Sequence, residues 1–340
     1  MLRSFPMPLL CLLLGCSPEP GDGARETISL EGKAMGTTWE VTFRELPENV
    51  SQETLRGEIE ATLERIESLA SHWRTDTPVS QFNQTLDTQP FPVPSDLLAI
   101  LKTAERIHHK TEGAFDVTVA PLVNLWGFGP IEETRGKIPS DEEIENALAS
   151  MGQDKLELLP KSSIRKTRPD LQLDLSAIAK GFAIDQIAQR LDESGVLHYL
   201  IELGGELRAK GNGSKGDGWQ VGLEHPEGDA NTTKIHRTIA LENAAVATSG
   251  NYRLAFTDPD TGQSYSHLID PRTGRPVSHD LLAVSVLASN AMEADAWATA
   301  LLVLGPEKGM QLADKENLAA LFVERGPSGI QVLTTANFPR

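Results

Sequence analysis

Two side chains that carry oxygen, Asp295 and Thr299, stand four residues apart in an apolar segment that favours a helix. Side chains at this spacing emerge on one face of a helix. A carboxylate and a hydroxyl held together suit a hard cation such as Mg²⁺, which takes oxygen ligands and shares its coordination sphere with substrate phosphates. The alternative is an acidic residue near a helix start, where the helix dipole favours it.

Residues 174–181, Asp-Leu-Ser-Ala-Ile-Ala-Lys-Gly, have the features of an anion site. The sequence predicts a short strand over residues 171–175 that enters a helix over residues 176–194, which Gly195 ends. The start of such a helix presents free N–H groups to phosphate, and Lys180 adds a mobile positive charge. The segment is equally consistent with a helix that Ser176 caps and a Lys180 that only faces solvent.

A third segment, residues 267–274, joins a histidine to a turn. Its Asp-Pro-Arg-Thr-Gly sequence is typical of a turn, which accounts for Asp270. The turn does not account for His267, which ends a run that predicts a buried strand. An imidazole held there is able to act as a general base or to hydrogen-bond a ring or a phosphate. We interpret the other histidines, including His108 and His109, as structural or surface residues.

Four further segments are rich in glycine and small polar residues: 34–38, 113–116, 204–206 and 248–251. Each lets the backbone approach a ligand closely, and each also fits a plain turn or bulge. The residues alone therefore indicate an oxygen-ligand metal site, a helix start that faces phosphate, and one well-placed histidine.

The spacing of apolar residues predicts the elements that must position these groups. Helices are expected from a cap at Ser51 to about residue 69, over 95–113, over 140–152 after a capping box, over 176–194, and over 292–312 with an interruption at 305–306. Strand-like runs fall at 26–43, 198–267, 283–286, 318–323 and 330–333. Helices and strands mix without regular alternation, so we expect an α+β fold in a single large domain over residues 27–338, not a doubly wound sheet.

The first 15 residues are expected to be a signal peptide. Their apolar run, residues 9–14, is shorter than the ~20 residues that a membrane-spanning helix needs, and it leads into Gly15-Cys16. This ending resembles the lipobox of bacterial lipoproteins, in which cleavage leaves a lipid-carrying cysteine, here Cys16, at the new N-terminus. A plain signal peptide with a chance cysteine is the alternative. Residues 16–26 then suit a flexible tether.

Cysteine content and charge exclude several classes of function. Cys11 and Cys16 are the two cysteines, so the mature chain keeps one thiol and has neither an internal disulfide nor a cysteine metal site. Removal of residues 1–15 takes away Arg3 and changes the net charge from −17 to −18. This charge argues against nucleic-acid binding and repels an anionic ligand at long range, so local cations or a metal must overcome the repulsion.

Taken together and in this order, the segments resemble the ApbE-type FAD:protein FMN transferases, once described as thiamine-biosynthesis lipoproteins. The resemblance extends from about Ile28 to Val332, and a lipobox is common in the family. The matching segments are residues 35–37, 80–83, 113–116, 174–181, 204–206, 267–274 and 294–299.

The resemblance implies a role for each matching residue. Mg²⁺ would be bound by the side chains of Asp295 and Thr299, with the backbone carbonyls of Ala177 and Ala298. The implied FAD site comprises Met35, Trp73, Asn83, Ala114, Phe115, Asp116, Asp174, Lys180 and Leu282. His267 matches the histidine implicated in transfer, with Asp270 or Asp174 as the alternative base. Trp73 stands where many relatives have Tyr, which keeps an aromatic ring for flavin contact but removes the phenol. Ala298 stands where many have an acidic residue, so we expect weaker metal binding.

The implied reaction is an attack by a Thr or Ser hydroxyl of an acceptor protein on the FMN-side phosphorus of FAD, with AMP as the leaving group and Mg²⁺ neutralising the pyrophosphate. The implied acceptors are exported flavoproteins, such as subunits of sodium-pumping or related redox complexes. The expected location is a membrane-anchored lipoprotein that faces the periplasm or the cell exterior. Two alternatives are an FAD pyrophosphatase, which would use water as the nucleophile, and a non-catalytic FAD-binding lipoprotein, which would need no metal beside the pyrophosphate.

Overall fold

The computed structural model describes residues 26–224, 235–251, 255–258, 261–327 and 329–339, so the predictions about residues 1–25, including Cys16, lie outside the described residues. The helices are α1 (Gln52–Ala70), α2 (Pro78–Gln84), α3 (Ser95–Lys110), α4 (Ala120–Leu125), α5 (Asp141–Ser150), α6 (Ala179–Glu193), α7 (Ala291–Leu304) and α8 (Pro306–Lys315), with short 3-10 helices η1 (Glu132–Thr134) and η2 (Gln153–Lys155). Within these described ranges, no helix is both long enough and apolar enough to cross a membrane.

The strands form one large sheet and several small ones. The large sheet has the order β1 (Ile28–Ala34), β2 (Thr37–Phe43), β6 (Tyr199–Leu203), β7 (Glu206–Lys210), β10 (Ala244–Gly250), β15 (Leu281–Ala288), β16 (Ala319–Gly326) and β17 (Gly329–Thr334). The small sheets are β3 (Phe91–Pro92) with β5 (Ser163–Lys166) and β4 (Leu156–Leu159), β8 (Trp219–Glu224) with β9 (Ile235–Leu241), β11 (Ala255–Thr257) with β12 (Ser264–Ser266), and β13 (Ile269–Asp270) with β14 (Arg275–Pro276).

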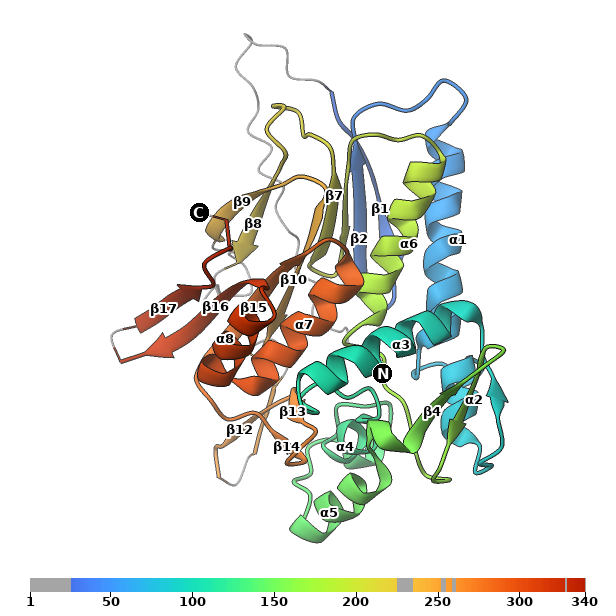
Figure 1. Cartoon of the computed structure of the whole chain (residues 1–340), viewed down its shortest axis with the longest axis vertical. Helices are drawn as coiled ribbons and strands as arrows, with labels where there is room; N and C mark the ends of the chain where they lie inside the picture. The colour runs from blue at the N-terminus through green and yellow to red at the C-terminus, as the bar shows by residue number, and fades with distance from the viewer. Residues whose placement is uncertain (1–25, 225–234, 252–254, 259–260, 328, 340) are drawn as a thin grey trace.

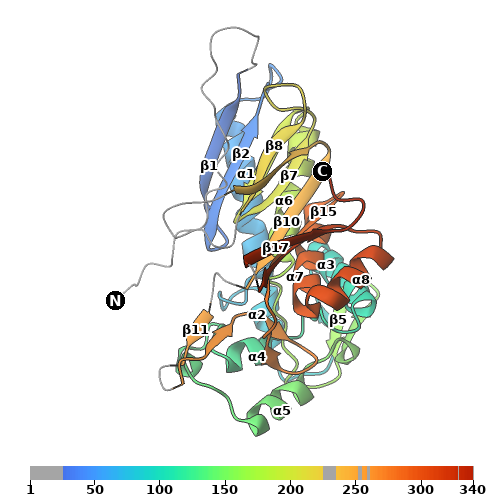
Figure 2. The ribbon, with the colours of Figure 1, turned by 90° about the vertical axis from the view of Figure 1, so that its left-hand side faces the viewer.

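Each neighbouring pair in the large sheet is antiparallel. Of the long insertions between its strands, two concern the site: α1 to α6 lie between β2 and β6 in sequence, and β11 to β14 lie between β10 and β15. Figure 1 shows α1, α6 and α7 on one face of the sheet, with α3, α4 and α5 grouped at one end. Figure 2, turned by 90°, places β11 beside α4 at that same end. The insertions therefore gather where a pocket can form, and the fold is the predicted α+β class.

In the middle of the large sheet both faces are buried, and neighbouring side chains along a strand point to opposite faces. On β6, Tyr199 and Ile201 join the core beneath the helices, whereas Leu200 joins a second core beneath β8 and β9. On β16, Phe322 likewise joins the core beneath the helices, whereas Leu321 joins the core beneath β8 and β9. The sheet is consequently a rigid layer with helices on one side and a β hairpin on the other.

Local sequence signals set most helix ends. Ser51 accepts a hydrogen bond from the Thr54 backbone at 3.1 Å and so begins α1. Ser140 forms the expected capping box at α5. Gly195, with φ of +80°, follows α6, and Gly305, with φ of +82°, separates α7 from α8. These predictions are confirmed, because a cap needs partners within only a few residues.

Three local predictions are wrong. Residues 171–175 form no strand, because they pair with no strand among the residues that the structure describes, and the helix after them begins at Ala179 rather than Ser176. Instead of capping a helix, Ser176 donates its backbone N–H to the Asp174 carboxylate at 2.8 Å. His267 lies in a bend between β12 and β13 and is half-buried, and it does not end a buried strand.

Two helices, α6 and α7, approach each other closely at Gly181, in the first turn of α6. A Cβ atom at this position would lie 2.3 Å from the carbonyl oxygen of Ala291, at the start of α7. Because no such atom is present, the Gly181 N–H donates to the Asp295 carboxylate at 3.1 Å. The close contact at Gly181 is therefore with α7 of the same chain.

We predict that Gly181→Ala lowers the free energy of unfolding by about 1–3 kcal/mol or more, because the added methyl group forces the two helices apart. Urea unfolding monitored by circular dichroism measures this change. The matched control is Gly57→Ala on the exposed side of α1, where nothing lies within 4 Å of the new Cβ. That change should stabilise the protein by about 1 kcal/mol. Equal effects at both positions would contradict the close approach at Gly181.

Candidate functional site

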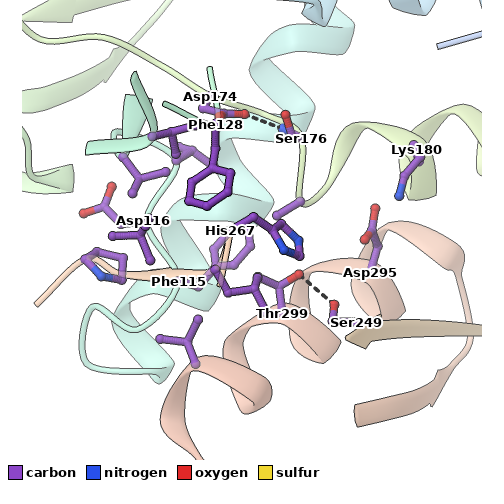
Figure 3. A pocket seen from close by; sticks show the side chains of 18 of the residues that line it. Phe115, Asp116, Phe128, Asp174, Ser176, Lys180, Ser249, His267, Asp295 and Thr299 are labelled. Carbon is purple, nitrogen blue, oxygen red and sulfur yellow. Dashed lines mark hydrogen bonds between the residues drawn. The ribbon is translucent and has the colours of Figure 1, made fainter. Parts of the chain in front are cut away.

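A cavity of about 400 Å³ lies where the two insertions meet α6 and α7. Its walls come from the segments that follow α1 and α3, from α4, from the segment before α6 and its first turn, from the β6–β7 turn, from β10, from the loop between β12 and β13, and from α7. The predicted site residues that line it are Trp73, Ala114, Phe115, Asp116, Asp174, Ala177, Lys180, His267, Asp295 and Thr299. Segments distant in sequence therefore converge on one space, as Figure 3 shows for the labelled residues.

One corner of the cavity is rich in oxygen atoms. Asp295 and Thr299 both face it from α7, as their spacing predicts. Asp295 is buried, and burial raises the pKa of its carboxyl to about 7, although the nearby Lys180 ammonium acts in the opposite direction. The Thr299 hydroxyl forms a hydrogen bond of 2.9 Å with the Ser249 hydroxyl on β10. This corner thus holds a carboxylate that is buried away from water beside two hydroxyl groups.

Lys180 forms an ion pair beside this corner. Its ammonium lies 2.6 Å from Oε1 of Glu206, a buried residue at the start of β7. The second oxygen of Glu206, Oε2, is buried and has no hydrogen-bond partner among the residues that the structure describes. Sequence reasoning placed Glu206 in a matching segment without giving its side chain a role. The ion pair fixes the position of the Lys180 ammonium beside the corner.

The opposite wall of the cavity is aromatic. Phe115 and Phe128 face it, and the Phe128 ring lies edge-to-face with the His267 ring at 6.2 Å between centroids. Phe128 also contacts Phe256 on β11, whose ring stacks on Tyr265 at 5.2 Å. Sequence analysis missed Phe128, since a single aromatic residue after α4 gives no signal of its own. A planar ring system suits this wall, and an anionic group suits the corner opposite.

Two histidines that we had interpreted as structural or surface residues lie beside pocket carboxylates. His72 lines the cavity, and its Nδ1 is 3.5 Å from the Asp174 carboxylate. His108 lies 3.5 Å from the Asp116 carboxylate and 2.9 Å from the Phe115 carbonyl oxygen. Burial raises the pKa of Asp116, whereas hydrogen bonds from Thr118 lower it. No local spacing signal marks either histidine, because each pairing depends on the folded chain.

Five of the predicted site residues are absent from the cavity lining: Met35, Asn83, Asp270, Leu282 and Ala298. Met35 occupies the tight turn between β1 and β2 with φ of +50°, and its N–H donates to Glu67 at 3.0 Å. Leu282 and Ala298 are buried in β15 and α7. Neither contributes a side chain to the cavity wall.

Asp270 and Asn83 use their polar atoms within the protein. The Asp270 carboxylate receives the Arg272 guanidinium at 2.8 and 2.7 Å and the Arg272 backbone N–H at 2.9 Å, so it holds the turn closed. The Asn83 amide donates to the Leu173 carbonyl oxygen at 2.8 Å and accepts from the Leu173 N–H at 2.7 Å. Both residues therefore support a wall of the cavity from behind.

Known proteins match this chain over most of its length. A model of the ApbE family matches residues 35–322. The FAD:protein FMN transferase of Vibrio cholerae (strain O395) is 38% identical over 329 residues, which cover 97% of this chain and 95% of that protein. The protein of the same name from Escherichia coli K12 is 37% identical over 318 residues, which cover 92% and 89% of the two chains.

Solved structures agree with these matches. The flavin transferase ApbE from Vibrio cholerae has a TM-score of 0.84 at 38% identity and covers 92% of this chain and 98% of its own. The apo form of the Pseudomonas stutzeri flavinyl transferase ApbE has a TM-score of 0.82 at 36% identity, with coverage of 92% and 95%. The resemblance inferred from the motifs is confirmed, because the matched range includes every segment of the cavity wall. The chain belongs to the ApbE family.

Proposed function

We propose that this protein transfers the FMN half of FAD to a Thr or Ser hydroxyl of an acceptor protein and releases AMP. One observation carries the proposal: a single cavity joins an aromatic wall, His267 and the corner formed by Asp295 and Thr299. FAD has the matching parts, a planar ring system and a pyrophosphate. Relatives that match nearly the full length of this chain are named FAD:protein FMN transferases.

Each part of FAD has a counterpart in the cavity. Trp73, Phe115 and Phe128 offer aromatic surface for the flavin ring. Trp73 is about half exposed at 49%, which leaves its ring available at the edge of the cavity. Lys180, in the first turn of α6, offers its positive charge to the phosphates.

The transfer step exchanges one phosphorus–oxygen bond for another. The acceptor hydroxyl oxygen attacks the FMN-side phosphorus and forms a new P–O bond, while the P–O bond to AMP breaks and AMP leaves as a phosphate monoester. We assign the hydroxyl proton to His267, which lines the cavity. Of the two alternative bases, Asp270 has both carboxylate oxygens bonded to Arg272, and Asp174 accepts the Ser176 N–H and lies beside His72. This assignment separates His267, which acts on the nucleophile, from Lys180, which binds the phosphates.

The residues of the oxygen-rich corner fit a hard divalent cation. Asp295 is a buried carboxylate whose charge burial disfavours, and a bound cation would compensate that charge. In the described ranges no group of three or more His, Cys, Asp or Glu residues is placed to hold a metal, so the donors would be few. The side chains of Asp295 and Thr299 and the carbonyls of Ala177 and Ala298 would hold Mg²⁺, which shares its sphere with substrate phosphates. When bound, Mg²⁺ supplies positive charge that neutralises the pyrophosphate.

The location and the acceptor form part of the same proposal. Cys16 follows a short apolar run and Gly15, and a lipid on Cys16 would hold the enzyme at the outer face of a membrane. Exported flavoproteins, such as subunits of sodium-pumping or related redox complexes, are then the acceptors within reach.

The test is to incubate the purified protein with FAD, Mg²⁺ and an exported flavoprotein that contains an acceptor Thr. Intact-mass analysis should show one added FMN on the acceptor, with one AMP released for each. Free FMN and AMP in place of the modified acceptor would show an FAD pyrophosphatase. FAD bound without turnover would show a flavin-binding protein that is not an enzyme.

We predict that Asp295→Ala lowers the transfer rate by orders of magnitude, because it removes the charged ligand of the metal. High Mg²⁺ concentrations should restore part of the rate, since Thr299 and the carbonyls remain. The matched control is Asp314→Ala on the exposed side of α8, which changes the net charge equally and should leave the rate unchanged. Full activity of the parent protein in excess chelator would remove the metal from the mechanism.

We predict that His267→Ala keeps most of the affinity for FAD and loses transfer, because the aromatic wall and Lys180 remain while the base is gone. Flavin fluorescence gives the dissociation constant, and intact mass of the acceptor gives the rate. His109→Ala, at an exposed position on α3, is the matched control. If binding and transfer fall by the same factor, His267 is a flavin contact and not the base.

We predict that Cys16→Ser abolishes lipid attachment, so that the protein accumulates as an uncleaved or soluble precursor. Metabolic labelling with a fatty acid and fractionation of membranes measure both effects. The lipobox interpretation fails if the variant is labelled and fractionates with membranes as the parent does.

A further inference from the structure

The segment from Pro169 to Leu173 runs directly into Asp174 and Ala177 in the cavity wall, yet it belongs to no strand. Leu171 and Leu173 are fully buried, so the polar backbone groups around them need partners inside the protein. In a sheet these partners would be the backbone of a neighbouring strand. Here, two side chains take that place.

The first is Lys166, the last residue of β5, whose side chain is buried and only 1% exposed. Its ammonium donates to the carbonyl oxygens of Phe82 at 2.7 Å and Thr85 at 2.9 Å, at the end of α2. It also donates to those of Pro169 at 3.2 Å and Leu171 at 3.0 Å. One charged group therefore ties α2 to the segment that leads into the cavity wall.

The second is Asn83, on α2, whose amide bonds both the N–H and the carbonyl oxygen of Leu173, as a neighbouring strand would. One residue further along, the Asp174 N–H donates to the Val117 carbonyl oxygen at 2.8 Å, next to the wall at Asp116. Between Pro169 and Asp174 the chain is thus fixed at successive points, and the position of the Asp174 carboxylate follows from them.

We propose that Lys166, acting with Asn83 through residues 169–173, is a positioning residue that sets the affinity of the cavity for FAD, although neither side chain lines the cavity. The proposal rests on the proposed function, in that it takes FAD as the ligand. It also gives Asn83 a role: the residue shapes the FAD site through the backbone of Leu173 and does not touch the ligand.

A buried ammonium at this position needs a reason, because an apolar residue would be less costly to bury. On β5, Lys166 points to the same side as Ile164, a residue with no exposed surface, so the position is one where an apolar side chain is expected. Burial lowers the pKa of Lys166 to about 8, while the nearby Asp170 carboxylate acts to raise it. Asp170 is itself paired with Arg168 at 2.7 Å, and α2 contributes carbonyl groups but no charged side chain.

Loss of the Lys166 proton would remove one donor hydrogen and the charge that holds the carbonyls. The position of residues 169–173 should then depend on pH, and FAD affinity with it. Since the pKa is lowered to about 8, the ammonium is the main form at pH 7 and is lost as the pH rises through about 8. FAD affinity of the parent protein should therefore fall over this range.

The experiment measures the FAD dissociation constant by flavin fluorescence from pH 6.5 to 9.5, with no acceptor protein. The variants are Lys166→Met, which keeps the length of the side chain and removes the charge, Asn83→Ala, and the double variant. The control is Lys102→Met at an exposed position on α3. Urea unfolding at each pH identifies variants that are not folded. The control also reports the titration of the flavin and of other groups, since it differs from the parent only at a surface lysine.

At pH 7 we expect Lys166→Met to weaken FAD binding by ~10-fold, the effect of about 1.4 kcal/mol. The FAD affinity of Lys166→Met should not fall above pH 8, whereas the FAD affinities of the parent and of the control should. The double variant should bind no more weakly than the weaker single variant, because both changes release the same segment. If Lys166→Met is folded and its dissociation constant and pH profile equal those of the control, the proposal is overturned.

A second comparison applies if Lys166→Met does not fold. Asn83→Ala must then weaken FAD binding, and the parent must show the fall above pH 8. An unchanged dissociation constant in Asn83→Ala, or a flat pH profile in the parent, overturns the proposal. A parent protein that binds no FAD at any pH would instead contradict the proposed function, so the two failures are distinguishable.

Discussion

The contact between α6 and α7 at Gly181 is the constraint on which the site depends. At this point two helices approach so closely that a single methyl group would overlap the backbone of Ala291. The approach brings the Gly181 N–H to the buried Asp295 carboxylate, and it places Lys180, one residue earlier, at the same corner. Asp185, one turn further along α6, receives the first N–H groups of α7, from Ala291 and Met292, at 2.9 Å each. The packing of α6 against α7 therefore also sets the positions of Lys180 and Asp295 in the site.

The large sheet supplies rigidity, whereas the chain inserted between its strands supplies the walls of the cavity. β10 contributes Ser249 directly, and α7 contributes Asp295 and Thr299 from its position on the sheet. Much of the remaining wall comes from irregular chain, which must satisfy its own polar groups. Side chains do this at several places: Asp270 closes its turn around Arg272, and Asn83 pairs with Leu173.

Sequence analysis identified features that depend on neighbours along the chain. The caps at Ser51 and Ser140, the helix end at Gly195 and the shared face of Asp295 and Thr299 all follow from spacings of a few residues. The family resemblance added the residues that gather in the cavity. Features that depend on distant partners were missed: His72 beside Asp174 gives no local signal, and residues 171–175 resemble a strand in composition but pair with no strand in the described part of the chain.

The pairing of Phe43 on β2 with Tyr199 on β6 has a consequence for the growing polypeptide. The chain is synthesised from its N-terminus, so β1 and β2 exist long before β6 is available to cover the open edge of β2. An isolated two-stranded hairpin is only marginally stable, and an open edge can pair with other chains. The period before β6 emerges is therefore an interval in which this protein is exposed to aggregation, and a molecule that shields exposed strands would protect it then.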